Sequence, residues 1–156
     1  LITCFSAPEL QKVIAGDNTR LDIADLRRNV RYGAGYTDNH RVIRWLWDIV
    51  GQEFSYDEQK KFLKFVTSCS KPPVLGFATL EPKFTIRCVA NARNEESYNG
   101  LDVMKNFFGL TVRENKRLPT ASTCFNLLKL PQYKSKGTLR EKLRYSLSAG
   151  AGFELS

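Results

Sequence analysis

Apolar residues recur along the chain with two different periods. In the first half they follow helical spacing over residues 23–30, 40–50 and 56–66. In the second half the apolar runs are short and are bounded by turn-forming residues, which is typical of strands. The pattern therefore changes from helix to sheet near the middle of the chain. Strands are expected at 76–80, 84–89, 107–112 and 123–130.

Capping residues mark where the predicted helices begin and end. Ser55 and Glu58 form a capping box, and Asp22 can cap the helix that follows it. A closing helix is expected from Thr138, with its end at Gly150, because glycine favours helix ends. Helices, then a small sheet, then a closing helix predict an α+β fold class.

The N-terminal segment also has a helical pattern. Ser6 and Glu9 have capping-box spacing, and Gly16 is a typical residue after the end of a helix. A short helix is therefore expected before Gly16. The residues that follow it, 16–20, are polar and form a connector.

The chain is basic, with 24 Lys and Arg residues against 16 Asp and Glu residues and a net charge of +8. Such a surplus is compatible with nucleic-acid binding. However, the sequence contains no run of five basic residues and no RNA-recognition signature, so no nucleic-acid partner is expected. The basic residues are densest over 129–144, where they predict a solvated helix face or a surface for an acidic protein.

Other functional classes are excluded by what the sequence lacks. No run of 18 apolar residues is present, so no membrane span is expected. The four cysteines include no CxxC pair, and His40 is the only histidine, so no metal site and no disulfide framework are predicted. This cysteine usage fits a cytoplasmic protein. Because Met104 is the only methionine, the sequence is expected to be a piece of a longer chain.

Cys124 is the strongest candidate for chemistry. It follows Pro119 and a run of small hydroxyl residues, which places it where a loop enters a predicted strand. There it is either a reachable nucleophilic thiol or a buried cysteine that packs as a small apolar residue. His40 is the only possible imidazole base, and a capping or surface role suits it as well. Without a base, an activated acyl donor such as a thioester is the expected substrate.

The residues around Cys124 resemble the active-site segment of HECT-type ubiquitin ligases. The segment LPTASTCFNLLKLPQY, residues 118–133, contains the family's Leu-Pro, Thr-Cys-Phe-Asn and L-x-L-P-x-Y elements. The L-R-E-K-L run at 139–143 and the ending Gly-Phe-Glu-Leu-Ser also resemble the family, which has a phenylalanine fourth from its C-terminus. The closest resemblance is to the subfamily of ubiquitin-protein ligase types B and C.

The resemblance implies a two-lobed enzyme of which this chain is mainly the second lobe. Residues 1–16 would end the N-lobe, 17–20 would be a hinge, and 21–156 would form the C-lobe. Cys124 would accept ubiquitin as a thioester from a ubiquitin-conjugating enzyme and pass it to a lysine of a protein substrate. No cofactor is implied. The implied substrate-binding residues are Leu118, Thr123, Phe125, Asn126 and Phe153.

The sequence also departs from the family pattern. Ser122 stands where many members have a histidine before Thr-Cys, Lys71 replaces a common arginine, and Arg87 replaces an acidic residue. Residues 91–106 resemble an insertion. A non-catalytic, basic protein-interaction module with a structural Cys124 therefore stays open as the alternative function.

Overall fold

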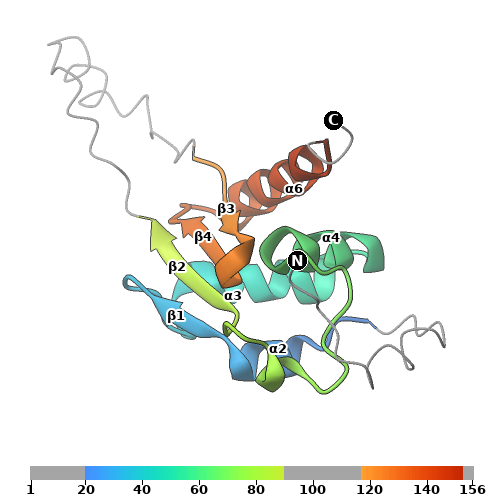
Figure 1. Cartoon of the computed structure of the whole chain (residues 1–156). Helices are drawn as coiled ribbons and strands as arrows, with labels where there is room; N and C mark the ends of the chain where they lie inside the picture. The colour runs from blue at the N-terminus through green and yellow to red at the C-terminus, as the bar shows by residue number, and fades with distance from the viewer. Residues whose placement is uncertain (1–19, 90–116, 153–156) are drawn as a thin grey trace, which may run out of the picture.

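The computed structural model describes residues 20–89 and 117–152 (Figure 1). Three helices begin the described part, and each starts at a side chain that accepts a backbone N–H. Helix α2 (Ile23–Asn29) is capped by Asp22, and α4 (Tyr56–Thr67) has the predicted capping box of Ser55 and Glu58. Helix α3 (Arg41–Asp48) is capped by the imidazole of His40 and continues into a π-helical turn, η1 (Ile49–Glu53).

Four short strands form one sheet in the order β1-β2-β4-β3. Strand β1 (Arg31–Gly33) is parallel to β2 (Thr85–Val89), which is parallel to β4 (Leu127–Pro131). Strand β3 (Thr120–Ser122) is antiparallel to β4 and is joined to it by a 3-10 turn, η3 (Thr123–Phe125). The parallel pairs require the chain to cross from β1 to β2 through α3 and α4.

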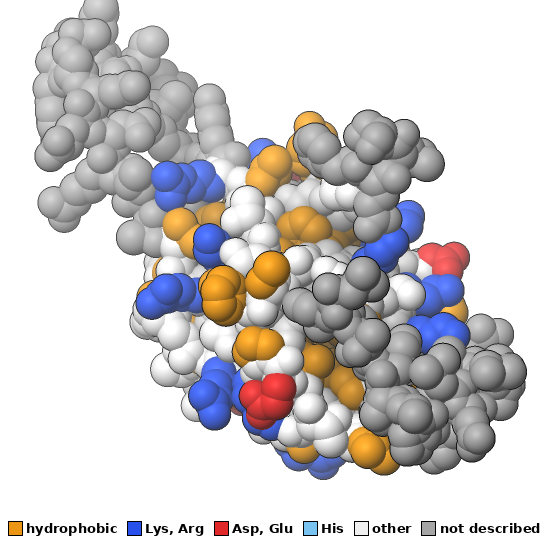
Figure 2. Space-filling view, in the orientation of Figure 1, with side chains coloured by type: hydrophobic (Ala, Val, Ile, Leu, Met, Phe, Trp, Pro, Cys, Tyr) orange, Lys and Arg blue, Asp and Glu red, His pale blue; other side chains and the backbone are white. Residues whose placement is uncertain are grey.

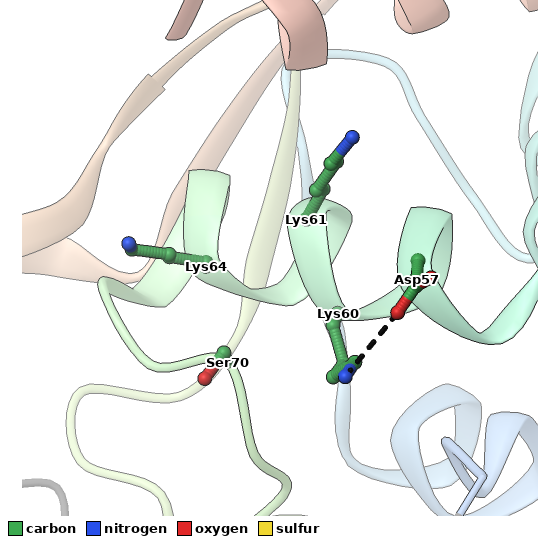
Figure 3. A pocket seen from close by; sticks show the side chains of 5 residues that line it. All are labelled: Asp57, Lys60, Lys61, Lys64 and Ser70. Carbon is green, nitrogen blue, oxygen red and sulfur yellow. Dashed lines mark ion pairs between the residues drawn. The ribbon is translucent and has the colours of Figure 1, made fainter. Parts of the chain in front are cut away.

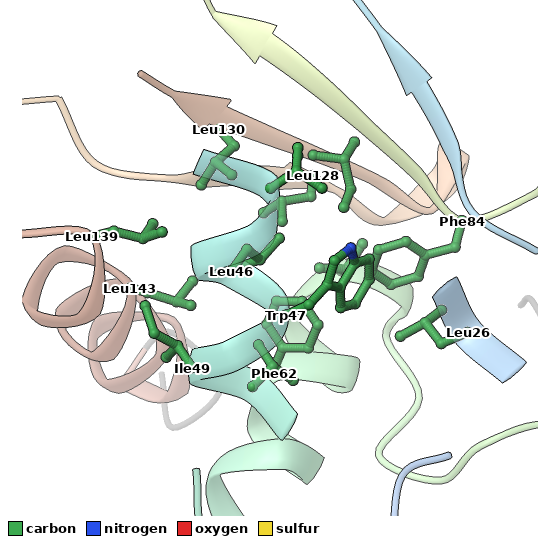
Figure 4. Packing of buried hydrophobic residues seen from close by; sticks show 14 of the residues in the cluster. Leu26, Leu46, Trp47, Ile49, Phe62, Phe84, Leu128, Leu130, Leu139 and Leu143 are labelled. Carbon is green, nitrogen blue, oxygen red and sulfur yellow. The ribbon is translucent and has the colours of Figure 1, made fainter. Parts of the chain in front are cut away.

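The core lies between one face of this sheet and the helices (Figure 4). Ile86, Leu128 and Leu130 point inward from the strands and are fully buried. Phe62 of α4 packs against Phe84, with the ring centroids 6.1 Å apart. The helices contribute the remaining buried side chains that the figure labels, which are Leu26, Leu46, Trp47, Ile49, Leu139 and Leu143.

Helix α6 (Lys136–Gly152) closes the fold against α3 and α4. Lys136 and Arg140 both pair with Glu53, and Arg144 pairs with Glu58 at 2.8 Å. These ion pairs add polar contacts at the edge of the apolar interface, where such pairs give modest stability.

The predicted α+β class is confirmed, and several details of the prediction are wrong. The strand expected at 76–80 is instead a 3-10 turn, η2 (Phe77–Thr79), because the carboxylate of Asp25 accepts the Phe77 N–H at 2.7 Å. The strand expected at 123–130 begins only at Leu127, because residues 123–125 form the η3 turn, and β3 was not anticipated.

The predicted ends of the closing helix are also wrong. Helix α6 begins two residues before Thr138, whose N–H is bound by the Ser135 hydroxyl. It continues past Gly150, which lies against the ring of Phe65 of α4. Tertiary packing therefore maintains the helix despite its glycines. The predictions for the helix before Gly16, for the strand at 107–112 and for the insertion at 91–106 fall outside the described residues.

Candidate active site

Cys124 lies at the centre of the η3 turn, between the two antiparallel strands β3 and β4. Its side chain is exposed, and its thiol is free. Cys88, the other free cysteine of the described part, is half-buried in β2, and Cys69 is disulfide-bonded, which the sequence analysis did not anticipate. The structure therefore places the thiol of Cys124, and not that of Cys88, where a large acyl donor can reach it.

Asn126 holds the end of this turn in place. Its backbone has the left-handed conformation, with φ at 48°, which asparagine tolerates better than most residues. Its side chain is only 5% exposed, and its Nδ2 donates to the carbonyl oxygen of Pro82 at 2.6 Å. Its own carbonyl oxygen accepts the N–H of Thr85 at 2.9 Å. The turn that holds Cys124 is thus attached by two hydrogen bonds to the segment that leads into β2.

The other predicted site residues are distributed around this turn. Thr123 is half-buried, whereas Phe125 is 65% exposed beside Cys124. Leu118, at 36% exposed, precedes β3, and the Tyr133 hydroxyl donates to the carbonyl oxygen of Arg117 at 2.7 Å. One exposed apolar side chain, Phe125, is therefore adjacent to Cys124 in the chain, and Leu118 is exposed before the far end of β3. Phe153 lies outside the described residues.

His40 is engaged elsewhere as a structural group. Its Nδ1 accepts the N–H of Val42 at 3.2 Å, and its ring lies 4.8 Å from the ring of Tyr36. Tyr36 in turn donates its hydroxyl to the carbonyl oxygen of Leu130, near the end of β4. Cys124 precedes the start of that strand, so the imidazole and the thiol lie toward opposite ends of β4. The structure supports the capping role of His40.

A tyrosine network stabilises the side of the fold that holds β1. The Tyr32 hydroxyl donates to Asp38 and accepts the Trp47 indole N–H, both at 3.0 Å. Burial raises the pKa of Tyr32 to about 12, so it stays protonated. Bidentate hydrogen bonds from Arg27 hold the pKa of Asp38 below its ordinary value. This network is structural and includes no group of the η3 turn.

A surface groove of about 250 Å³ lies elsewhere on the described part of the chain (Figure 3). It is lined along α4 by Asp57, Lys60, Lys61 and Lys64, and by Ser70. Lys60 pairs with Asp57 at 3.3 Å, so part of its charge is compensated. No residue of the η3 turn lines this groove.

The described residues also allow a test for a metal site or a membrane span. Over 20–89 and 117–152, no three His, Cys, Asp or Glu side chains gather as metal ligands do. None of the helices in those ranges has the length and apolar content needed to cross a bilayer.

Sequence reasoning identified the cysteine but missed the segment that supports it. Pro82 is separated from Asn126 by 44 positions, and nothing in the spacing of the two residues links them. The available signal was Asn126 itself, since asparagine between a turn and a strand is typical of a left-handed residue with a hydrogen-bonding side chain.

Comparisons with known proteins agree with this geometry. The HECT-domain (ubiquitin-transferase) family matches residues 1–156. Ubiquitin-protein ligase E3B of Homo sapiens is 54% identical over 99% of this chain. E3 ubiquitin-protein ligase UPL6 of Arabidopsis thaliana is 46% identical over 99% of the chain, and E3 ubiquitin-protein ligase HUL5 of Saccharomyces cerevisiae is 43% identical over 97%.

The chain belongs to the HECT family, and the predicted resemblance is confirmed. The name of the human relative also agrees with the predicted type B and C subfamily. The chain spans about 15% of the length of the E3B proteins, 13% of UPL6 and 14% of HUL5.

Proposed function

We propose that this chain provides the catalytic lobe of a ubiquitin ligase and that Cys124 carries ubiquitin as a thioester. One observation carries the proposal: an exposed, free thiol sits on a turn that is fixed by Asn126, in a chain of the ubiquitin-transferase family. The proposed donor is a ubiquitin-conjugating enzyme, and the proposed acceptor is a lysine of a protein substrate.

In the first step, the Cys124 sulfur attacks the carbonyl carbon of the thioester between ubiquitin and the conjugating enzyme. One carbon–sulfur bond forms and another breaks, and the thiolate of the conjugating enzyme leaves. The first N–H groups of a 3-10 turn have no acceptor within the turn itself. The backbone N–H groups at Thr123 and Cys124 are therefore proposed to stabilise the developing oxyanion.

In the second step, the amine of the acceptor lysine attacks the ubiquitin thioester at Cys124. The nitrogen loses a proton, an isopeptide bond forms, and the Cys124 thiolate leaves. A carboxylate would assist the proton loss. Glu154 is proposed for this role. Glu81 is a second candidate, since it adjoins Pro82, which binds Asn126.

The remaining site residues are proposed to position ubiquitin. Phe125 is exposed beside Cys124 and Leu118 is exposed before β3, and both suit contacts with the ubiquitin tail. Thr123 and Asn126 support the turn from the inside. Phe153 is proposed to bind the C-terminal tail near Cys124, as the family resemblance implies.

The boundaries of the lobes are part of the same proposal. Residues 1–16 are proposed to end the N-lobe, 17–20 to act as the hinge and 21–156 to form the C-lobe. A cytoplasmic location is proposed because the thiol of Cys124 must stay reduced to react, although the disulfide at Cys69 is a feature of oxidising compartments. The proposed chemistry uses the cysteine, backbone N–H groups and a carboxylate, and needs no cofactor.

The test is a single-turnover thioester assay with the complete ligase, a charged conjugating enzyme and non-reducing electrophoresis. Cys124→Ala is expected to abolish the reducible ubiquitin adduct, and Cys124→Ser is expected to give a slower, thiol-resistant oxyester. Cys88→Ala is the matched control, since Cys88 is the other free thiol of the described part, and it should load normally. A reducible adduct on Cys124→Ala would support a structural cysteine and the alternative, non-catalytic module.

A further inference from the structure

Within residues 20–89 and 117–152, one face of the sheet carries no helix. Helices α3, α4 and α6 contribute to the core on the other face, where Ile86 and Leu128 are buried, so the residues that alternate with these two point outward. Figure 1 looks onto this outer face, with α3 behind the strands. The strand register defines its two rows, which are Arg31–Thr85–Leu127–Ser122 and Gly33–Arg87–Lys129–Thr120.

The outer face is basic, and its charge is not compensated. Arg31 and Arg87 are exposed, and Lys129 is half-buried. None of the three takes part in an ion pair or a side-chain hydrogen bond in the described structure. Neither row contains an acidic residue. In the space-filling view, Lys and Arg side chains line the side of the surface over β1 and β2, with apolar side chains between them (Figure 2).

The pairing of Arg87 with Lys129 is unfavourable for the isolated fold. The two residues are direct partners on adjacent strands, which run about 4.8 Å apart. Like charges at directly opposed positions destabilise a sheet. A local arrangement that costs stability without compensation within the fold is often found at functional surfaces.

The same face leads directly to the proposed catalytic turn. Ser122 is the outermost residue of the first row, and it is also the residue from which the η3 turn starts. A segment lying across the sheet from Arg31 to Ser122 would therefore end beside Cys124. The hydroxyl groups of Thr120 and Ser122 would offer hydrogen bonds along the way.

We propose that this outer face, defined by Arg31, Arg87 and Lys129, binds an acidic segment of the acceptor protein and so favours lysines that have acidic neighbours. This inference rests on the proposed function, because it assigns the substrate class of the Cys124 site. Charge complementarity indicates the kind of segment that binds. The outer face has three unpaired cations and no acidic residue in its two rows, which favours a partner with carboxylate side chains. Because the face is open to solvent, its contribution is modest and salt-dependent.

The first test is a binding assay that does not depend on ubiquitin transfer. The complete ligase carrying Cys124→Ala is titrated into a fluorescein-labelled peptide with one lysine flanked by glutamates, and into a matched peptide with glutamines. We expect tighter binding of the acidic peptide by about fivefold at about 0.05 M salt and no preference at about 0.5 M. Adding Arg87→Gln and Lys129→Gln should remove the preference.

The matched control neutralises the same number of charges away from the sheet. Arg44 lies on α3 and Lys142 on α6, and neither makes an ion pair in the described structure. The Arg44→Gln, Lys142→Gln variant should therefore retain the fivefold preference. Equal loss of preference in both double variants would overturn the proposal, since net charge alone would then explain the binding.

The second test measures transfer in the complete ligase with an intact Cys124. Arg87→Gln with Lys129→Gln should load ubiquitin at the normal rate and discharge normally to the glutamine peptide. Discharge to the glutamate peptide should be slowed by about fivefold. Impaired loading would assign this face to ubiquitin or to the conjugating enzyme and would overturn the proposal. Failure of Cys124 to load at all would contradict the proposed function, while the binding result would still stand.

A nucleic acid is the competing occupant of a basic face. The probe is a single-stranded uridine oligonucleotide with the same number of negative charges as the acidic peptide. Binding of the oligonucleotide that is tighter than peptide binding at about 0.15 M salt, and that is lost in the Arg87→Gln, Lys129→Gln variant, would overturn the assignment to an acidic protein segment.

Discussion

The side-chain amide of Asn126 donates to the carbonyl oxygen of Pro82 at 2.6 Å, which links the turn of Cys124 to the segment before β2. The two residues lie 44 positions apart in the sequence. Asn126 also has a left-handed backbone. The position therefore requires both a residue that tolerates positive φ and a side chain that binds Pro82, and substitutions can remove one without the other.

Replacing Asn126 should weaken the turn to a degree that depends on the new residue. Asn126→Gly accepts the positive φ but loses the bond to Pro82, at a cost of about 1 kcal/mol. Asn126→Ala loses the bond and also adds left-handed strain of about 1–2 kcal/mol. Urea denaturation should therefore rank the free energy of unfolding as wild type, then glycine, then alanine.

Single-turnover loading of Cys124 tests whether the bond between Asn126 and Pro82 matters for the reaction. Both variants lack the Pro82 bond, so both should load ubiquitin more slowly than wild type. If the glycine variant loads at the wild-type rate, the bond to Pro82 does not hold the thiol for the reaction.

Phe153→Ala should affect the second transfer step more than the first. The proposed role of Phe153 is to hold the carboxylate of Glu154 near the acceptor amine, and loading of Cys124 needs no such base. We expect normal thioester formation and a discharge to lysine that is slower by about tenfold, equivalent to about 1.4 kcal/mol in the barrier. Pulse-chase discharge assays measure the two steps separately.

Tyr145→Ala provides the control for the Phe153 variant. Tyr145 is an aromatic residue on α6 that is 62% exposed, and it has no proposed role in transfer. Its substitution should leave both steps unchanged. Equal slowing of loading and discharge by Phe153→Ala would indicate a general defect of the lobe.

Gly76→Ala should destabilise the fold more than Gly35→Ala. Both glycines have positive φ, at 88° and 91°, so both variants introduce backbone strain of about 1–3 kcal/mol. A Cβ at Gly76 would also lie 3.0 Å from Oδ2 of Asp25, whereas a Cβ at Gly35 would contact nothing within 4 Å. Thermal unfolding of the two variants isolates this contact, and equal melting temperatures would contradict it.

Glu53 should make the stability depend on pH through its contacts with α6. Hydrogen bonds from Arg140, and then from Lys136, hold the pKa of Glu53 below its ordinary value. A lowered pKa in the folded state stabilises the protein above the unfolded pKa of about 4.3, and this stability is lost as the pH falls toward the lowered value. Glu53→Gln should therefore lower the melting temperature by about 3 °C at pH 7.

The effect of Glu53→Gln should decrease below about pH 4, where the wild-type carboxylate also becomes protonated. Glu141→Gln is the matched control, because Glu141 is exposed on α6 and makes no ion pair in the described structure. Its melting temperature should follow that of wild type at both pH values. A constant difference between Glu53→Gln and wild type would show that the contacts of Glu53 with α6 are not the cause.

Local sequence signals predicted the helices well, because their information lies within a few residues. The capping box of Ser55 and Glu58 and the cap at Asp22 both occur where the sequence indicates. The pattern of short apolar runs predicted strand β2 but not β1 or β3, which are only three residues long. Strands of this length contain too little periodicity to be recognised without their partners.

The sequence by itself determined the α+β class, the family and the identity of the candidate nucleophile, since each depends on adjacent residues such as Thr123, Cys124 and Phe125. The tertiary structure decided the features that require distant residues to meet. Asp25 binds the Phe77 N–H in a turn where a strand was predicted, Gly150 of α6 lies close to Phe65 of α4, and the sheet register places Arg87 beside Lys129. Contacts between residues far apart in the chain depend on the packing of the whole fold, which local patterns do not specify.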